Sequence, residues 1–170
     1  MSRGPGEGEP RRQPLSRKIK VRVADMPRHY ETLRYAADAF GDDFPQEAYE
    51  AAARSTDPAQ LTQVYAVEHG FELLVNSISQ LVRETLEQHG LREPDDAQNA
   101  PADLHAFCEA GAITKAQRDR MISLCRLRNE LQHEYPDVRA SSIHEGVKVL
   151  LAEIGPFMQS YSAWLKRETV

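Results

Sequence analysis

The chain has 170 residues, of which 41% are hydrophobic and 28% are charged, and its formal net charge is −5. This length suffices for one domain with its own hydrophobic core. No apolar run approaches the roughly 18 residues that a membrane-spanning helix needs, which argues against an integral membrane protein. The first 15 residues contain no apolar segment, so no secretory signal is predicted. Two cysteines, Cys108 and Cys125, are too few for a disulfide framework. We therefore expect reduced thiols and a cytoplasmic protein.

The charge is distributed unevenly along the chain. Residues 1–28 contain eight Lys or Arg against three Asp or Glu, whereas the remainder is net acidic. A net-acidic body argues against a protein that coats nucleic acid regardless of sequence, because such binding depends on neutralising phosphates. Residues 115–139 form a locally basic window within this acidic body. The window is compatible with an anion site or with a solvated helix face. We expect residues 1–24 to be a flexible basic tail and residues 25–168 to be one helical domain.

Helical spacing of apolar residues begins after the predicted tail. Pro27 suits the first position of a helix that continues to Gly41, and residues 46–54 predict a short second helix. Asp57 and Pro58 then supply an N-cap and a first-turn proline for a helix about 30 residues long. Its apolar stripe consists of Val64, Val67, Phe71, Leu74, Ile78 and Leu81.

The second half of the chain continues the helical pattern. A short helix is predicted around residues 102–110, and Thr114 caps the next helix, which Pro136 stops. Residues 142–166 predict the last helix, again with one apolar stripe. No alternating strand pattern is present in the sequence. The predicted fold is all-α, an antiparallel helical bundle of four longer helices plus short helices.

Polar side chains that could take part in catalysis or binding are concentrated in the segment RNELQHEYP, residues 128–136. On a straight helix Asn129 and His133 lie on one face, whereas Arg128 and His133 diverge by about 140°. Three arrangements would bring Arg128 and His133 together. The arginine side chain wraps around the helix, the helix loosens before Pro136, or a second copy of the segment completes the site. A structural role is the alternative, since Arg and His near a helix end often pair with the terminal carbonyl groups.

The longer segment MISLCRLRNELQHEYPDV resembles the signature of HEPN domains, and most closely that of HepT-type toxins, whose motif is Arg-x4-His-x-Tyr. The long helix YAVEHGFELLVNSISQLVRETLEQHGL is similar to the second helix of that family. The resemblance extends over about residues 60–168. Three features depart from the family pattern: Gln132, which stands before the motif histidine, the basic N-terminal tail, and residues 41–58, which resemble an insertion.

The resemblance implies a metal-independent endoribonuclease that needs no cofactor. Histidine is the side chain whose unperturbed pKa lies nearest neutrality, so His133 would exchange protons with the ribose 2′-hydroxyl or the leaving oxygen. Arg128 would hold the scissile phosphate, and Asn129 would orient the imidazole or the phosphate. Arg126 and Tyr135 would contact the RNA. No metal-ligand spacing involves the other histidines.

The resemblance also implies partners. In the family a two-fold homodimer brings two motifs to a shared cleft, and an MNT-type nucleotidyltransferase antitoxin silences the toxin by adding AMP to the motif tyrosine, here Tyr135. The expected function is therefore the toxin of a toxin–antitoxin pair, with RNA as substrate. The alternative is a non-catalytic HEPN module that binds a nucleotidyltransferase or another protein.

Overall fold

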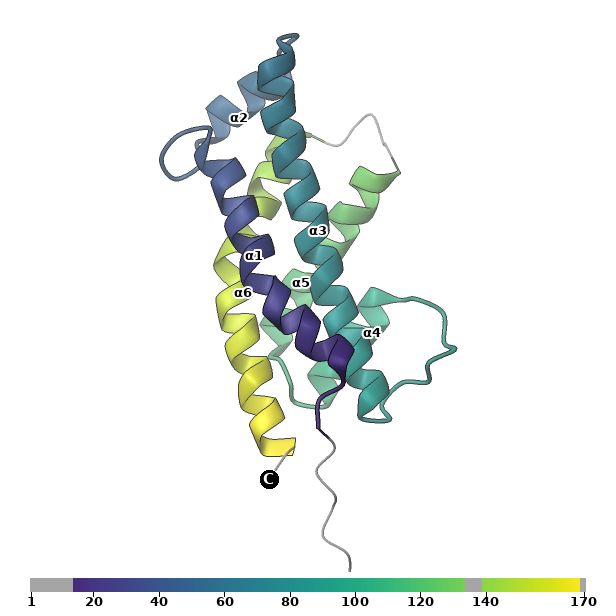
Figure 1. Ribbon diagram of the computed structural model, residues 1–170. Coiled ribbons are helices and arrows are strands. Elements are labelled where there is room, and N and C mark those ends of the chain that lie inside the picture. The colour runs from purple at the N-terminus through teal and green to yellow at the C-terminus, as the bar shows by residue number, and fades with distance from the viewer. Residues whose placement is uncertain (1–13, 134–138, 169–170) are drawn as a thin grey trace, which may run out of the picture.

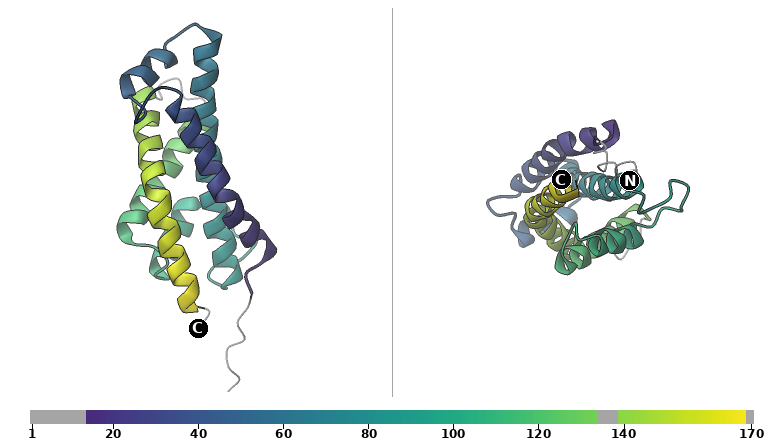
Figure 2. Two further views of the ribbon diagram at one scale, coloured as in Figure 1. Left: turned by 60° about the vertical axis from the view of Figure 1, so that its left-hand side comes forward. Right: turned by 90° about the horizontal axis from the view of Figure 1, so that it is seen from below.

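The computed structural model describes residues 14–133 and 139–168. Six helices form these parts of the chain: α1 (Arg17–Asp38), α2 (Gln46–Ala53), α3 (Pro58–Gln88), α4 (Ala100–Glu109), α5 (Lys115–Gln132) and α6 (Ala140–Glu168). The described residues contain no strand. The four longer helices α1, α3, α5 and α6 alternate in direction along one bundle axis, as Figures 1 and 2 show. The prediction of an all-α antiparallel bundle is confirmed.

The predicted boundary of the N-terminal tail is wrong, because α1 begins at Arg17 rather than after residue 24. The Ser16 side chain accepts a hydrogen bond from the backbone N–H of Ile19, and Ile19 itself is fully buried. The Ser16 backbone N–H also donates to the Gln88 side chain of α3 at 2.7 Å. Pro27 therefore lies inside α1 and not at its first position. Packing against α3 sustains the helix despite the hydrogen bond that a proline cannot donate.

α3 is the central helix of the bundle. Asp57 caps it through the backbone N–H of Ala59, with Pro58 in the first turn, as predicted. All six residues of the predicted apolar stripe are buried. α1 approaches α3 so closely that a Cβ added at Gly70 would lie 3.2–3.4 Å from atoms of Leu33, one of them in the backbone. Because α3 contacts both α1 and α5, it fixes the position of these two helices relative to each other.

α5 and α6 complete the bundle on the other side of α3. Thr114 and Gln117 form a capping box at the start of α5, because each side chain accepts a hydrogen bond from the other's backbone N–H. α5 packs on α3, α4 and α6, on the side of the bundle away from α1 (Figure 2). Within the described ranges, no helix is long and apolar enough to cross a lipid bilayer.

Candidate active site

α5 carries the described part of the motif. Met121, Leu124 and Cys125 form its buried stripe, and Arg128 follows at the same helical spacing. Arg128 is accordingly half-buried. A charged side chain at a position that faces the core needs a polar partner there. The helical period that packs α5 against α3 thus also turns the motif arginine inward.

Asn76 of α3 receives the Arg128 side chain. The Nη1 group of Arg128 donates a hydrogen bond to Oδ1 of Asn76, which is itself half-buried. The Nε atom of Arg128 is buried and has no acceptor among the described residues. A buried donor without an acceptor costs about 1–3 kcal/mol, more when it is charged. The arginine is therefore anchored on one side by Asn76, and its Nε–H is buried away from solvent.

Cys125 and Ser79 lie one helical turn below the Arg128–Asn76 contact. The Ser79 hydroxyl oxygen and the Cys125 sulfur are 3.5 Å apart. Burial raises the pKa of the Cys125 thiol, although Ser79 and Arg128 act in the opposite direction. The thiol is thus a protonated core group and not a nucleophile. Both cysteines are free, as predicted, with Cys125 buried and Cys108 half-buried.

The other described motif residues lie on a different side of α5. Arg126, Asn129 and His133 are all exposed and follow one another at spacings of three and four residues. His133 is the C-cap of α5, and its backbone N–H donates to the carbonyl oxygen of Asn129 at 3.2 Å. Arg128 contacts Asn76 of α3, whereas His133 is exposed at the end of α5. Tyr135, assigned to substrate binding and AMP addition, lies outside the described residues.

Two carboxylates on α3 were not selected in the sequence analysis. Glu68 and Glu72 precede Asn76 by eight and four residues, so the three side chains share one helical face. Burial, and secondarily the charge of Glu72, raises the pKa of Glu68. The buried hydroxyl of Tyr49 has no hydrogen-bond partner among the described residues, and burial together with Glu68 raises its pKa. The i, i+4 run of polar residues along a buried helix was the sequence signal for this group.

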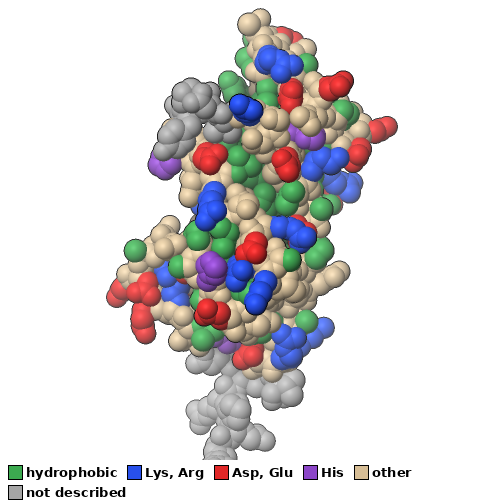
Figure 3. Space-filling model, turned by 180° about the vertical axis from the view of Figure 1, so that it is seen from behind, with side chains coloured by type: hydrophobic (Ala, Val, Ile, Leu, Met, Phe, Trp, Pro, Cys, Tyr) green, Lys and Arg blue, Asp and Glu red, His purple; other side chains and the backbone are tan. Residues whose placement is uncertain are grey.

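These carboxylates disfavour phosphate on their part of α3, whereas α5 presents Arg126 beside Asn129 and His133. On the face that carries α4 and α5, acidic and basic side chains are interspersed (Figure 3). The described residues contain no group of three or more His, Cys, Asp or Glu side chains that could hold a metal ion. The described residues around the motif therefore do not form an extended basic surface on this face.

Comparison with known proteins assigns the family. A family model described as "HepT-like: Ribonuclease HepT-like" matches residues 46–161, which extend from the start of α2 into the last turns of α6. The matched range begins earlier than the expected start near residue 60, so α2 belongs to the family domain. The expectation that residues 41–58 depart from the family pattern is therefore wrong for residues 46–58. No curated protein and no solved structure matches the sequence. Because the family model covers more than half of the chain, this protein belongs to the HepT-like ribonuclease family.

Proposed function

We propose that the chain is a metal-independent endoribonuclease and the toxin of a toxin–antitoxin pair. The observation that carries the proposal is Arg128, a half-buried arginine of the motif whose Nη1 group is anchored by Asn76. A phosphate oxygen is an acceptor that matches the planar guanidinium, and its negative charge offsets the cost of keeping the arginine at this depth. Membership of a family described as ribonucleases supports RNA as the source of that phosphate.

In the proposed reaction the ribose 2′-oxygen attacks the adjacent phosphorus and the bond from phosphorus to the 5′-oxygen breaks. One His133 side chain takes the proton of the 2′-hydroxyl or gives a proton to the leaving 5′-oxygen. Arg128 stabilises the charge that develops on the phosphate oxygens. The products are a 2′,3′-cyclic phosphate and a free 5′-hydroxyl. Arg126 and Tyr135 are proposed to contact the RNA, and Asn129 to orient the imidazole or the phosphate.

A second copy of the chain is proposed to complete the site. Arg128 and His133 lie on different sides of α5, so a two-fold dimer in which Arg128 of one copy faces His133 of the other would join them at one phosphate. Mixing Arg128→Ala with His133→Ala protein tests this arrangement. If the subunits exchange freely, half of the dimers are mixed and each has one complete site, which gives about one quarter of wild-type activity. Absence of any recovery would contradict a shared site.

Cleavage of labelled RNA in the presence of EDTA tests the activity itself. We expect the wild type to cut, and Arg128→Ala and His133→Ala to lose cutting. Arg54→Ala and His105→Ala are matched controls, because both of these side chains are exposed and lie outside α5. Detection of the cyclic phosphate at the new 3′ end identifies the attacking group. Failure of pure, unmodified wild type to cut the tested RNAs would favour the alternative, a non-catalytic module that binds a nucleotidyltransferase.

Growth arrest on expression tests the toxin role. We expect arrest with the wild type and none with His133→Ala. Co-expression with an MNT-type nucleotidyltransferase is expected to relieve the arrest and to increase the mass of the chain by one adenylyl group. Tyr135→Phe should abolish this increase if Tyr135 is the modified residue, because phenylalanine lacks the acceptor hydroxyl.

A further inference from the structure

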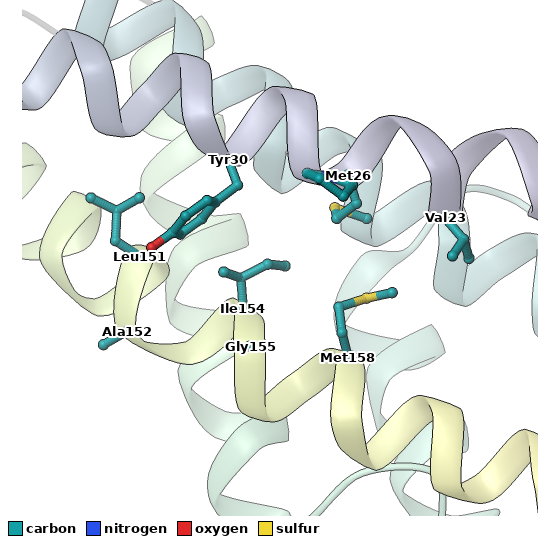
Figure 4. A pocket seen from close by; sticks show the side chains of 9 residues that line it. Val23, Met26, Tyr30, Leu151, Ala152, Ile154, Gly155 and Met158 are labelled. Atoms are coloured by element: carbon teal, nitrogen blue, oxygen red, sulfur yellow. The ribbon is translucent and has the colours of Figure 1, made fainter.

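α1 borders two hollows of similar size that differ in their lining. The apolar one, of about 410 Å³, lies between α1 and α6, and Figure 4 shows Met26 of α1 facing Met158 of α6 across it. The charged one, of about 420 Å³, lies between the start of α1 and α3, and we call it the α1–α3 hollow. Its lining residues are Arg17, Lys18, Val21 and Arg22 of α1 and Glu84 of α3. Three cations against one carboxylate give the α1–α3 hollow a net charge of +2.

The cations of the α1–α3 hollow have few protein partners. Arg22 pairs with Glu84 at 3.5 Å, and 36% of the Arg22 side chain remains exposed. Arg17 and Lys18 are both exposed, and their side chains form no ion pair or hydrogen bond with another described residue. Two full positive charges at the hollow are therefore not neutralised by the described part of the chain.

These charges do not stabilise the helix that carries them. Cations near the start of a helix meet the positive end of the helix dipole, and the first turn of α1 contains no acidic residue to offset them. Like charges four residues apart, here Lys18 and Arg22, also repel each other. A bound anion would offset both effects, so the placement of the cations favours a function in binding over one in folding.

The α1–α3 hollow and the motif arginine border the same helix. Asn76 of α3 holds Arg128 of the motif. Glu84, eight residues later on α3, pairs with Arg22. Eight residues correspond to about 12 Å along the helix axis and a rotation of about 80°. Gln80 lies midway between the two contacts and is exposed, so the surface of α3 that joins them is open to solvent.

We propose that the α1–α3 hollow binds the phosphate backbone of the RNA whose scissile phosphate lies at the motif. The inference rests on the proposed ribonuclease function for the identity of the ligand. Phosphates recur about every 3.4 Å along a stacked strand, so about three to four nucleotides span the axial separation of 12 Å. Residues 29–170 have a net charge of −10, and the cations of the hollow counteract the repulsion of RNA by this acidic body. Such contacts add affinity without reading the base sequence.

The apolar residues of this segment do not favour a lipid surface as the ligand. A helix that lies on a membrane presents several large apolar side chains beside its cations. Within residues 17–24, Val21 is the one large hydrophobic residue that is exposed, whereas Ile19 is buried in the bundle. The outward side of the first turns of α1 therefore offers charge and little apolar area.

The test variant is Arg17→Gln combined with Lys18→Gln. Both side chains are exposed, so the folded chain should tolerate the double change. The matched control is Lys20→Gln combined with Arg28→Gln, which removes two positive charges from the same helix outside the hollow. Lys20 is exposed, and Arg28 forms one exposed ion pair, with Asp25. Circular dichroism should show the same helix content in the wild type and in both double variants.

Fluorescence anisotropy of a labelled single-stranded RNA of about 16 nucleotides measures the binding. All proteins in this assay also carry His133→Ala, which prevents cutting of the probe. We expect the dissociation constant of the test variant to rise about tenfold or more at low salt. The slope of its logarithm against the logarithm of the salt concentration should fall by about 1.4, because each lost phosphate contact removes about 0.7. The control variant should stay close to the protein with His133→Ala alone.

Cleavage assays with His133 intact separate this inference from the proposed function. The ratio of wild-type to test-variant kcat/KM should be larger for the 16-nucleotide RNA than for a dinucleotide, which has a single phosphate to bind. RNA binding that depends on Arg17 and Lys18 in a chain that cuts no RNA would contradict the ribonuclease proposal and still support this inference.

Three results would overturn the inference. The first is RNA affinity that the test variant does not alter. The second is an equal loss of affinity in the test and control variants, which would reflect the net charge of the chain and not the hollow. The third is binding of phosphatidylserine vesicles that requires Arg17 and Lys18 while RNA affinity does not, which would assign the surface to a membrane.

Discussion

Asn76→Ala is the substitution that most directly tests how the bundle supports the motif. The change removes the acceptor that holds the Arg128 guanidinium and leaves the charge of Arg128 in place. A hydrogen bond to a charged group contributes about 1.5–3 kcal/mol. If the whole loss applies to the transition state, it corresponds to a decrease of about 10- to 160-fold in kcat/KM. The decrease should be mainly in kcat, because a misplaced arginine still attracts RNA.

A double-mutant cycle distinguishes positioning from a general structural effect. RNA cleavage is measured for Asn76→Ala, Arg128→Ala and the double variant. If Asn76 acts only through Arg128, adding Asn76→Ala to Arg128→Ala causes no further loss. Ser79→Ala is the matched control, since Ser79 lies on the same side of α3 but contacts Cys125 rather than Arg128. Thermal denaturation of each variant accounts for changes in the folded fraction.

Two outcomes would refute this account of Asn76. Additive losses in the cycle would mean that Asn76 affects cleavage without Arg128. Equal losses in Asn76→Ala and Ser79→Ala would mean that any polar truncation on this side of α3 disturbs the site.

Three further predictions concern stability. Gly70→Val should destabilise the fold by about 1–3 kcal/mol, because the new side chain meets Leu33 of α1, whereas Gly155→Val points into open space and should be nearly neutral in thermal denaturation. Burial raises the pKa of Glu68, so the folded chain binds more protons than the unfolded chain at pH values between the two pKa values of this carboxyl. The free energy of unfolding therefore falls as the pH rises through this range. Glu68→Gln should reduce the fall, and urea denaturation at one pH below and one pH above the range would show it. Tyr49→Phe should leave stability unchanged or raise it by up to about 1 kcal/mol in the same assay, because it removes a buried hydroxyl without a partner among the described residues, and a clear loss would reveal a partner.

Local signals made most of the fold predictable. Asp57 with Pro58, and Thr114 with Gln117, act within one helical turn, and the structure begins α3 and α5 at these residues. The start of α1 was missed because a run of basic residues was interpreted as a solvated tail. Ile19 is the one fully buried residue in residues 17–24, Val23 packs half-buried against the core, and the burial of both depends on contacts with other helices. The amino-acid composition of residues 17–24 is dominated by the exposed basic side chains, so the few apolar residues on the buried side of the helix gave little signal.

The candidate site was predictable only where it depends on local helical spacing. The period of α5 predicts from the sequence that Arg128 and His133 diverge, and the structure places Arg128 against α3 and leaves His133 exposed. The sequence did not single out Asn76, because its pairing with Arg128 depends on how α3 and α5 are aligned along the bundle. That alignment follows from the packing of both apolar stripes. The stripes bury Cys125 beside Ser79, and one helical turn further they bring Arg128 to Asn76. The packing that stabilises the bundle thereby also anchors the motif arginine against α3.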